Sequence, residues 1–318
     1  MSHVYGPVPS RRLGRSLGID VVPALPNKTC NYNCVYCQLG RTKHLTNSRK
    51  AFFPVEDLYE ETTAQIESAG LENIDFFTFV GDGEPLLYSK IGDLIRLLKE
   101  NYDKPVCIIT NGSLLADPQV RDDIKNVDVI MPTLDAGRES LFKRINRPVR
   151  SVDYDGMIDG MIEFRKIFAG EIWIEYMAVD GLNDDMNSLN EVKQILTRIR
   201  PDRIYVNTPI RPPAEDWIRP PSHEKVQQIK IVLGSVVETH DINRDEEGDF
   251  YIEGNSEQQF IENLIKTIKR HPMKVSQVQD VCKTRKFSAE SILSNLITQK
   301  RIKKFKYQNK SYLLYHLM

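Results

Sequence analysis

The stretch Cys30-Asn31-Tyr32-Asn33-Cys34-Val35-Tyr36-Cys37 places three of the chain's five cysteines within eight residues. The other two, Cys107 and Cys282, lie far apart in the sequence. An odd number of cysteines with one tight group is typical of a metal site in a reducing compartment, not of a disulfide framework. The spacing therefore predicts a thiolate metal site.

Two kinds of metal site fit this spacing. Thiolate sulfur is a soft ligand that suits both zinc and iron–sulfur clusters. A closed zinc site needs four ligands, and His44 is a candidate fourth ligand beside the three cysteines. A four-iron cluster held by three cysteines leaves one iron open to a substrate. The spacing favours the cluster, with zinc as the alternative.

Six short apolar runs alternate with amphipathic stretches over residues 1–235. The expected strands are residues 17–22, 74–80, 106–110, 127–133, 172–179 and 203–207. The expected helices are residues 54–68, 90–100, 117–124, 153–168, 186–199 and 222–233. This alternation predicts an α/β fold with a parallel sheet, either doubly wound or curled toward a barrel. In both folds ligands bind at the carboxyl ends of the strands, and the cysteine stretch follows the first strand.

A glycine-rich turn, Gly81-Asp82-Gly83-Glu84-Pro85, follows the second expected strand. Glycines let the backbone approach a ligand closely. Glu84 offers a carboxylate that suits a ligand ammonium. An ordinary strand-to-helix turn with an acidic residue at the helix start explains the same residues equally well.

Together, the cysteine stretch and this turn resemble the signature of the radical S-adenosylmethionine (SAM) superfamily. The resemblance implies a partial (β/α)6 TIM-like barrel in which Cys30, Cys34 and Cys37 hold one [4Fe-4S] cluster. The open iron would bind SAM. One electron, from a donor such as flavodoxin or ferredoxin, would then split SAM into methionine and a 5'-deoxyadenosyl radical that abstracts hydrogen from a substrate.

The resemblance also implies which residues contact SAM. Gly83-Glu84-Pro85 aligns with the superfamily's Gly-Gly-Glu-Pro motif, whereas Asp82 is inserted between the glycines. Asp135 is equally suited to a helix cap. A carboxylate inside an apolar strand is costly unless it is paired, which makes Glu175 the preferred ligand for ribose or substrate. The implied SAM contacts are Tyr36, Gly81, Gly83, Glu84, Pro85, Asn111, Thr133, Asp135 and Glu175.

Four arginines, Arg11, Arg12, Arg147 and Arg211, lie at the expected strand mouths. A guanidinium suits carboxylate or phosphate recognition, although solvated surface arginines are as common. We expect the four to converge on an anionic substrate. The segments around Arg11 and Arg211 resemble a radical SAM subgroup that begins Gly-Pro-Val-Pro-Ser-Arg-Arg. That subgroup is distantly related to wyosine-type tRNA-modifying synthases, whose second cysteine cluster has no counterpart in this sequence.

The C-terminal part of the chain is strongly basic. Residues 265–318 contain thirteen lysines or arginines against Asp280 and Glu290, a net charge of +11 in a chain whose total is −1. Expected helices at 257–270, 276–284 and 288–299, followed by a hairpin around Gln308-Asn309-Lys310, predict a winged-helix-like domain over residues 256–318. An acidic connection, residues 236–255, joins it to the barrel. Nucleic acid is one expected partner, and capping of the barrel or protein interaction is the alternative.

Neither a run of eighteen apolar residues nor an apolar signal core occurs in the 318 residues, so we expect a cytoplasmic protein without a membrane partner. The leading hypothesis is a radical SAM enzyme whose substrate is unknown, with tRNA or another nucleic acid as one option and a peptide or small metabolite as the other. The rival is an iron–sulfur-sensing, nucleic-acid-binding regulator without enzymatic activity. The Glu84 turn separates them, because a sensor needs no ligand for the SAM ammonium.

Overall fold

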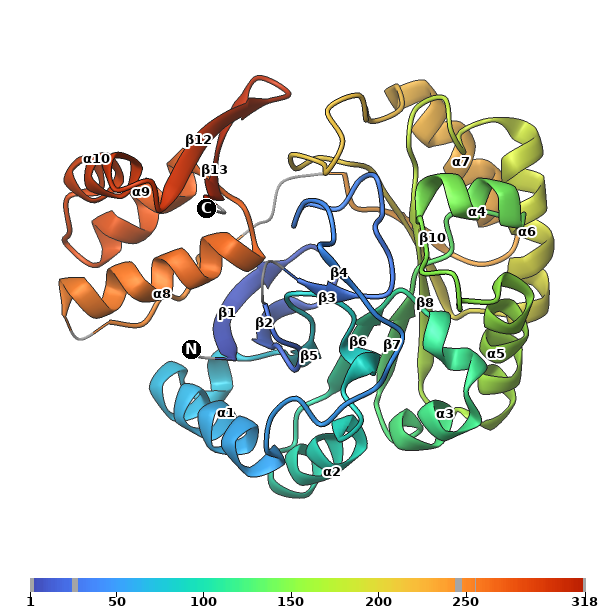
Figure 1. The fold of residues 1–318 in the computed structure, drawn as a ribbon, viewed down its shortest axis with the longest axis horizontal. Coiled ribbons are helices and arrows are strands. Elements are labelled where there is room, and N and C mark those ends of the chain that lie inside the picture. Colours follow the sequence, from blue (N-terminus) through green and yellow to red (C-terminus); the bar gives the residue numbers. More distant parts are fainter. Residues whose placement is uncertain (1–2, 25–27, 244–247, 255, 317–318) are drawn as a thin grey trace.

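The computed structural model describes residues 3–24, 28–243, 248–254 and 256–316. Its central feature is an eight-stranded sheet in which neighbouring strands follow the order β1-β2-β5-β6-β7-β8-β9-β10 (Figure 1). The strands are β1 (Val4–Ser10), β2 (Gly14–Ile19), β5 (Phe76–Phe79), β6 (Val106–Thr110), β7 (Val129–Pro132), β8 (Glu171–Met177), β9 (Arg203–Asn207) and β10 (Thr239–Asp241).

Parallel pairing joins the strands from β2 to β10, whereas β1 runs antiparallel to β2. The strands from β2 to β9 match the six expected strands, and their order along the sheet is their order in the chain. This arrangement confirms the predicted partial (β/α)6 barrel. The edge strands β1 and β10 are additions to the prediction. Strand β1 contains Pro7 and Pro9, and the sequence does not predict it because proline is unusual in strands. Strand β10 is three residues long, too short to be recognised from the sequence.

Helices surround the outside of the curved sheet (Figure 1). They are α1 (Val55–Ala69), α2 (Ile91–Asn101), α3 (Pro118–Ile124), α4 (Glu139–Ile145), α5 (Tyr154–Ile167), α6 (Met186–Ile199) and α7 (His223–Gly234). Asp117, Asp153 and Asp185 each accept a first-turn N–H and so fix where α3, α5 and α6 begin. Across the described ranges, no helix has the length and apolar character needed to span a bilayer.

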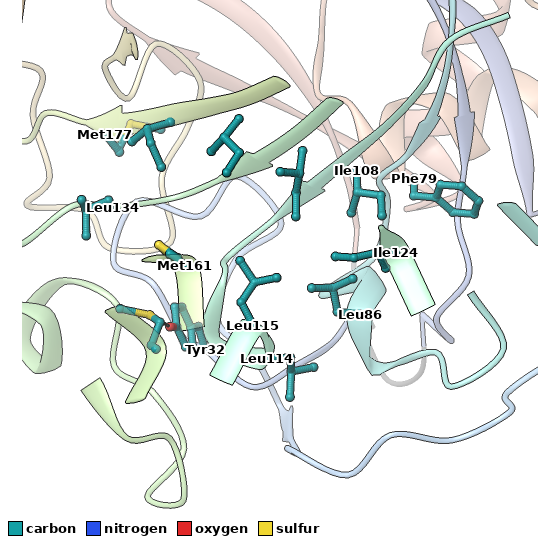
Figure 2. Packing of buried hydrophobic residues seen from close by; sticks show 14 of the residues in the cluster. Tyr32, Phe79, Leu86, Ile108, Leu114, Leu115, Ile124, Leu134, Met161 and Met177 are labelled. Atoms are coloured by element: carbon teal, nitrogen blue, oxygen red, sulfur yellow. Dashed lines mark hydrogen bonds between the residues drawn. The ribbon is translucent and has the colours of Figure 1, made fainter. Parts of the chain in front are cut away.

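The largest apolar core lies between the sheet and these helices. Ile108 of β6 packs there with Leu115 and Met161 (Figure 2). Tyr32, from the cysteine stretch, also enters this core, where its hydroxyl lies 3.1 Å from Met157 Sδ. The cysteine stretch is therefore anchored to the body of the barrel.

The inner face of the barrel has two layers. Cys107, Trp173 and Tyr205 belong to a smaller apolar cluster inside it. Side chains alternate along a strand, so residues two positions further share the same face. Glu175 and Asn207 are such residues, and they make the layer above this cluster polar.

Residues 256–316, called here the C-terminal module, contain helices α8 (Glu257–Arg270), α9 (Val275–Thr284) and α10 (Ala289–Thr298). A three-stranded sheet completes it, in the order β11-β13-β12. Its strands are β11 (Met273–Lys274), β12 (Ile302–Tyr307) and β13 (Lys310–Tyr315). The three helices and the hairpin lie where the sequence predicts them. The winged-helix assignment and the domain boundaries stay predictions.

Strand β1 connects the barrel with the C-terminal module. Its backbone pairs with β2, whereas its side chains Tyr5 and Val8 share an apolar cluster with Phe260, Leu264 and Ile268 of α8. Helix α8 accordingly lies beside β1 at one edge of the barrel (Figure 1). The module therefore covers one side of the barrel mouth.

Candidate functional site

The cysteine stretch forms a loop between β2 and α1, at the carboxyl end of the parallel strands. Two short strands, β3 (Thr29–Cys30) and β4 (His44–Leu45), pair in parallel and bring the two ends of this loop together. The N–H of Val35 donates to the carbonyl of Ile145 at 2.9 Å. The residues Cys30, Cys34 and Cys37 are half-buried and form no disulfide.

A buried lysine lies among these thiols. Lys28 is 2% exposed, and its Nζ lies 2.9 Å from Cys37 Sγ. Burial lowers the pKa of Lys28, but the charges of Cys37, Cys30 and Cys34 outweigh burial and leave it raised. Within the described ranges no carboxylate forms an ion pair with this ammonium. A buried ammonium needs an anionic neighbour, so the site fits a set of metal-bound thiolates.

Two of the thiols, those of Cys30 and Cys34, lie in surroundings that favour their protonated form. Burial raises the pKa of Cys30 to about 12 and raises the pKa of Cys34 as well. Thiolates are the metal ligands, so metal binding must release these protons.

His44, the candidate fourth ligand of a zinc site, lies in β4 with its side chain exposed to solvent. In the described part of the chain, no three His, Cys, Asp or Glu side chains surround a single ion position. In a four-iron cluster each cysteine ligates a different iron, so its ligands do not share one ion.

The glycine-rich turn packs directly on the cysteine loop. Gly83 has φ = +151°, and a Cβ at this position would lie 1.7 Å from the carbonyl oxygen of Thr29. In return, the N–H of Glu84 donates to that same carbonyl at 3.0 Å. Gly81 is equally confined, because a Cβ there would lie 2.3 Å from Asp20 Cγ. Glycine is needed at both positions to bring Glu84 against the cysteine loop.

Glu84 is buried, and both of its oxygens accept hydrogen bonds. Oε1 accepts from the Thr110 hydroxyl at 2.6 Å and from the N–H of Leu86 at 3.1 Å, within the short turn that starts at Pro85. Oε2 accepts from the N–H of Asn111 at 2.7 Å. Burial raises the pKa of Glu84 to about 7, although these hydrogen bonds oppose the shift. A ligand ammonium would favour the ionised carboxylate.

Asn111 connects the turn with the cysteines. Its backbone contacts Glu84, and its side-chain Nδ2 donates to Asn31 Oδ1 at 2.6 Å and lies 3.8 Å from Cys30 Sγ. The cysteine stretch and the glycine-rich turn, about fifty residues apart in the sequence, therefore both contact Asn111, which follows strand β6.

Asp135 and Tyr36 form a second tie between the cysteine loop and the barrel. The Tyr36 hydroxyl donates to Asp135 Oδ2 at 2.6 Å, and Asn146 Nδ2 donates to the same oxygen at 2.7 Å. Burial raises the pKa of Asp135 to about 6, against the hydrogen bonds from Tyr36, Asn146 and the N–H of Met177. Asp135 does not cap a helix, because α4 begins four residues later with Arg138 as its cap residue. Instead, it orients the aromatic ring beside Cys37.

Glu175 meets one of the predicted arginines. Its Oε2 accepts from Arg12 Nη1, and its Oε1 accepts from Asn207 Nδ2 at 3.2 Å. The carboxylate is therefore paired, as its place in an apolar strand requires. Thr133 lies next to Glu175 through a parallel backbone bridge, and its own N–H donates to the carbonyl of Thr110 at 3.1 Å.

The four predicted arginines separate into two groups. Arg11, Arg12 and Arg211 line one cavity inside the barrel mouth. Arg147 lies outside it and pairs with Glu215, 2.5 Å away. The sequence analysis expects four arginines to converge on one substrate, and the structure brings three of them to one cavity.

Lys28 and Asn146 are site residues that the sequence analysis does not single out. Lys28 is two residues before Cys30, and a lysine so close to a thiolate motif is a usable signal. Asn146 follows a helix that the sequence pattern does not predict, so its position beside Cys34 Sγ, at 3.7 Å, emerges only from the fold.

Comparison with known proteins agrees with this geometry. A family model of the radical SAM superfamily matches residues 25–191. The chain belongs to this superfamily and is a radical SAM enzyme. Membership implies a [4Fe-4S] cluster and SAM, and the residues around Cys37 and Glu84 fit both groups.

More particularly, the chain is similar over nearly its whole length to the UPF0026 protein MJ1312 of Methanocaldococcus jannaschii. The two are 34% identical over 313 residues, which cover 98% of this chain and 95% of that protein. A protein of Brachyspira hyodysenteriae named GTPase Obg is 41% identical over 228 residues, 71% of this chain, but the match spans only 33% of that protein. A solved structure of TYW1 with a lysine-pyruvate adduct bound has the same fold, with a TM-score of 0.51 at 18% identity, covering 70% of this chain and 73% of that one.

Proposed function

We propose that this enzyme binds SAM between the cysteine loop and Glu84, cleaves it reductively, and abstracts hydrogen from a substrate at the barrel mouth. The observation that carries the proposal is the position of Asn111, whose backbone holds Glu84 Oε2 at 2.7 Å while its side chain lies 3.8 Å from Cys30 Sγ. An ammonium ligand and a cluster ligand are thus fixed on either side of one residue.

The chain's own groups have distinct roles in this proposal. When bound, the cluster and SAM supply one-electron chemistry and a carbon radical. Cys30, Cys34 and Cys37 hold the cluster, and a reductant such as flavodoxin or ferredoxin supplies the electron. Glu84 accepts hydrogen bonds from the SAM ammonium. Glu175 and Thr133 are the groups assigned to the SAM ribose in this proposal.

The substrate approaches through a cavity of about 250 Å³ between the cysteine loop and the C-terminal module. Gln38, the residue after Cys37, lines it from the barrel side. Lys269 and Phe305 line it from the module side. A substrate in this cavity would lie close to the cluster and in contact with both parts of the chain.

The basic surface of the C-terminal module supports a second proposal, contact with nucleic acid. Lys303, Lys304, Phe305 and Lys306 of β12 are exposed in succession. Phe305 and Lys306 also line a surface hollow of about 570 Å³ together with Arg219. Lysines neutralise phosphates, and an exposed aromatic ring can stack on a base.

Anaerobic reconstitution with iron and sulfide, followed by dithionite and SAM, tests the main proposal. We expect 5'-deoxyadenosine and methionine, and we expect Glu84→Gln to lose most of this product while retaining its iron. An iron-loaded wild-type protein that forms no 5'-deoxyadenosine would favour the iron–sulfur-sensing regulator instead.

Fluorescence anisotropy with a labelled RNA tests the nucleic-acid proposal. Binding should weaken as salt rises, and a Lys303→Ala, Lys304→Ala, Lys306→Ala variant should lower the steepness of that dependence, because each phosphate contact contributes about one unit of slope. Lys90→Ala, an exposed lysine at the start of α2, is the control. Equal binding by the triple variant and the wild type would reject the contact.

A further inference from the structure

A small cavity inside the barrel mouth is lined by basic groups from three distant parts of the chain. Its volume is about 100 Å³. Arg11 and Arg12 come from the turn after β1, and Arg211 follows β9. Arg270 is the last residue of α8, and His271 follows it. The charged side chains that line it within the described ranges are all arginines, with the His271 imidazole beside them.

Hydrogen bonds hold these groups in place. Arg11 Nη1 donates to Asn207 Oδ1 at 3.2 Å and to the carbonyl of Ile242 at 2.5 Å. Arg211 Nη1 donates to Gln38 Oε1 at 2.7 Å. Arginine side chains fixed in this way lose little conformational freedom when they bind a ligand.

Arg12 offers a donor that the protein does not use. Its Nη1 pairs with Glu175, but its buried Nε has no hydrogen-bond partner among the described residues. A buried N–H without a partner costs free energy, and an acceptor from a ligand would remove that cost. Hydroxyls of Ser10 and Thr78 line the same cavity and can donate further, whereas the Ser16 hydroxyl already donates to Thr78 Oγ1 at 2.7 Å.

We propose that this cavity is an oxyanion subsite, which holds a carboxylate or phosphate group of the enzyme's substrate. The inference rests on the proposed function, because it places the substrate of the radical reaction. A cavity of about 100 Å³ has room for such a group but not for a whole drug-sized ligand, which needs about 300 Å³ or more. The remainder of the substrate extends toward the cluster.

The position of the subsite suits this role. Gln38, in its wall, follows Cys37 directly, and Ile109 of β6 is two residues before Asn111. An anion held by the arginines therefore fixes the substrate beside the site of radical formation. The C-terminal module completes the subsite through Arg270 and His271.

Isothermal titration calorimetry of the cluster-loaded full chain with inorganic phosphate and, separately, with acetate tests the subsite. We expect one of the two to bind at one site per chain, and the preferred anion identifies the group. Arg211→Met and Arg12→Met should each weaken binding at least tenfold. Arg41→Met is the matched control, because Arg41 pairs with Glu215 outside the cavity and is largely exposed.

Several outcomes would overturn the subsite. They are binding of neither anion by the wild type, an equal loss in Arg41→Met, or a tenfold loss of SAM affinity in Arg211→Met, which would assign the cavity to SAM. If Arg12→Met does not fold, Arg211→Met decides alone. Wild-type protein that forms 5'-deoxyadenosine but binds neither anion defeats the subsite and leaves the proposed function intact. Wild-type protein that binds an anion but forms no 5'-deoxyadenosine defeats the proposed function and leaves the anion site intact.

Discussion

Arg270, at the end of α8, donates a hydrogen bond from its Nε to Asp20 Oδ2 at 2.9 Å across a separation of 250 residues. Asp82 Oδ2 lies 3.7 Å from the same nitrogen, and all three side chains are buried. Asp82 is the residue inserted in the turn that holds Glu84. Its carboxylate therefore joins the turn to the C-terminal module, which gives the insertion a structural reason.

Arg270→Met should destabilise the protein strongly, by about 3–5 kcal/mol, because it removes the guanidinium from the buried Asp20 and Asp82 carboxylates and leaves Asp82 with Lys269 alone. Burial and the charge of Asp20 raise the pKa of Asp82 to about 7, opposed by Arg270 and Lys269. Removing Arg270 raises the pKa further, so the ionised form is penalised most at high pH. Urea unfolding should show a larger loss at pH 8 than at pH 5. Arg301→Met, which breaks an exposed pair with Glu262, should cost less than about 1 kcal/mol. A loss independent of pH would contradict this account.

SAM affinity should depend on the ionisation of Glu84. Its pKa lies at about 7 because the carboxyl is buried, and only the carboxylate attracts an ammonium. Affinity should therefore rise as the pH increases through about 7, and should fall by up to about tenfold per pH unit below 7. Equilibrium dialysis of the cluster-loaded protein measures this. Glu84→Gln should bind at least tenfold more weakly at pH 8 and lose this part of the pH profile. A variant that keeps the full profile would show that another group titrates.

Lys28→Met should lower the reduction potential of the cluster. The buried ammonium beside Cys37 stabilises the more negative, reduced state, and charge near the sulfurs is one of the factors that set cluster potentials. Redox titration followed by electron paramagnetic resonance gives the potential directly. Lys43→Met, an exposed lysine of the same loop, is the control. An unchanged or higher potential in Lys28→Met would refute the role.

Cys34→Ala should lose the cluster, whereas Cys282→Ala should retain it. Cys282 is buried in the C-terminal module, away from the cysteine loop. Iron analysis after reconstitution should give about four irons per chain in the wild type and in Cys282→Ala. Removal of the metal by a chelator should abolish 5'-deoxyadenosine formation, and reconstitution should restore it. Full iron content in Cys34→Ala would remove this residue from the ligand set.

The parallel strands could be predicted from the sequence, because each is a short apolar run with polar or turn-forming residues on both sides. Residues 106–110 and 203–207 are strands over the expected lengths. Strand β1 could not be predicted from the sequence, because Pro7 and Pro9 break the usual strand pattern. Its pairing with β2 depends on tertiary contacts. Helix α4 is as short as α3 but lacks the capping aspartate and first-turn proline that mark the start of α3 in the sequence.

In the candidate site, too, some residues could be predicted from the sequence and others could not. Cys30, Glu84 and Asn111 stand in short motifs at strand ends, and topology alone brings strand ends together. Contacts between distant parts of the chain leave no local pattern. The pairing of Arg12 with Glu175 and the separation of Arg147 from the other arginines depend on side-chain directions that only the folded chain defines.

Strand β1 belongs to two cores at once, and this affects the order in which the chain can reach its native state. A ribosome releases Tyr5 and Val8 about 250 residues before Phe260 and Leu264, which share their apolar cluster. During elongation the barrel therefore carries an uncovered apolar edge that later residues must seal. Vectorial synthesis leaves the barrel mouth, with its cysteine loop, accessible from this side until α8 arrives.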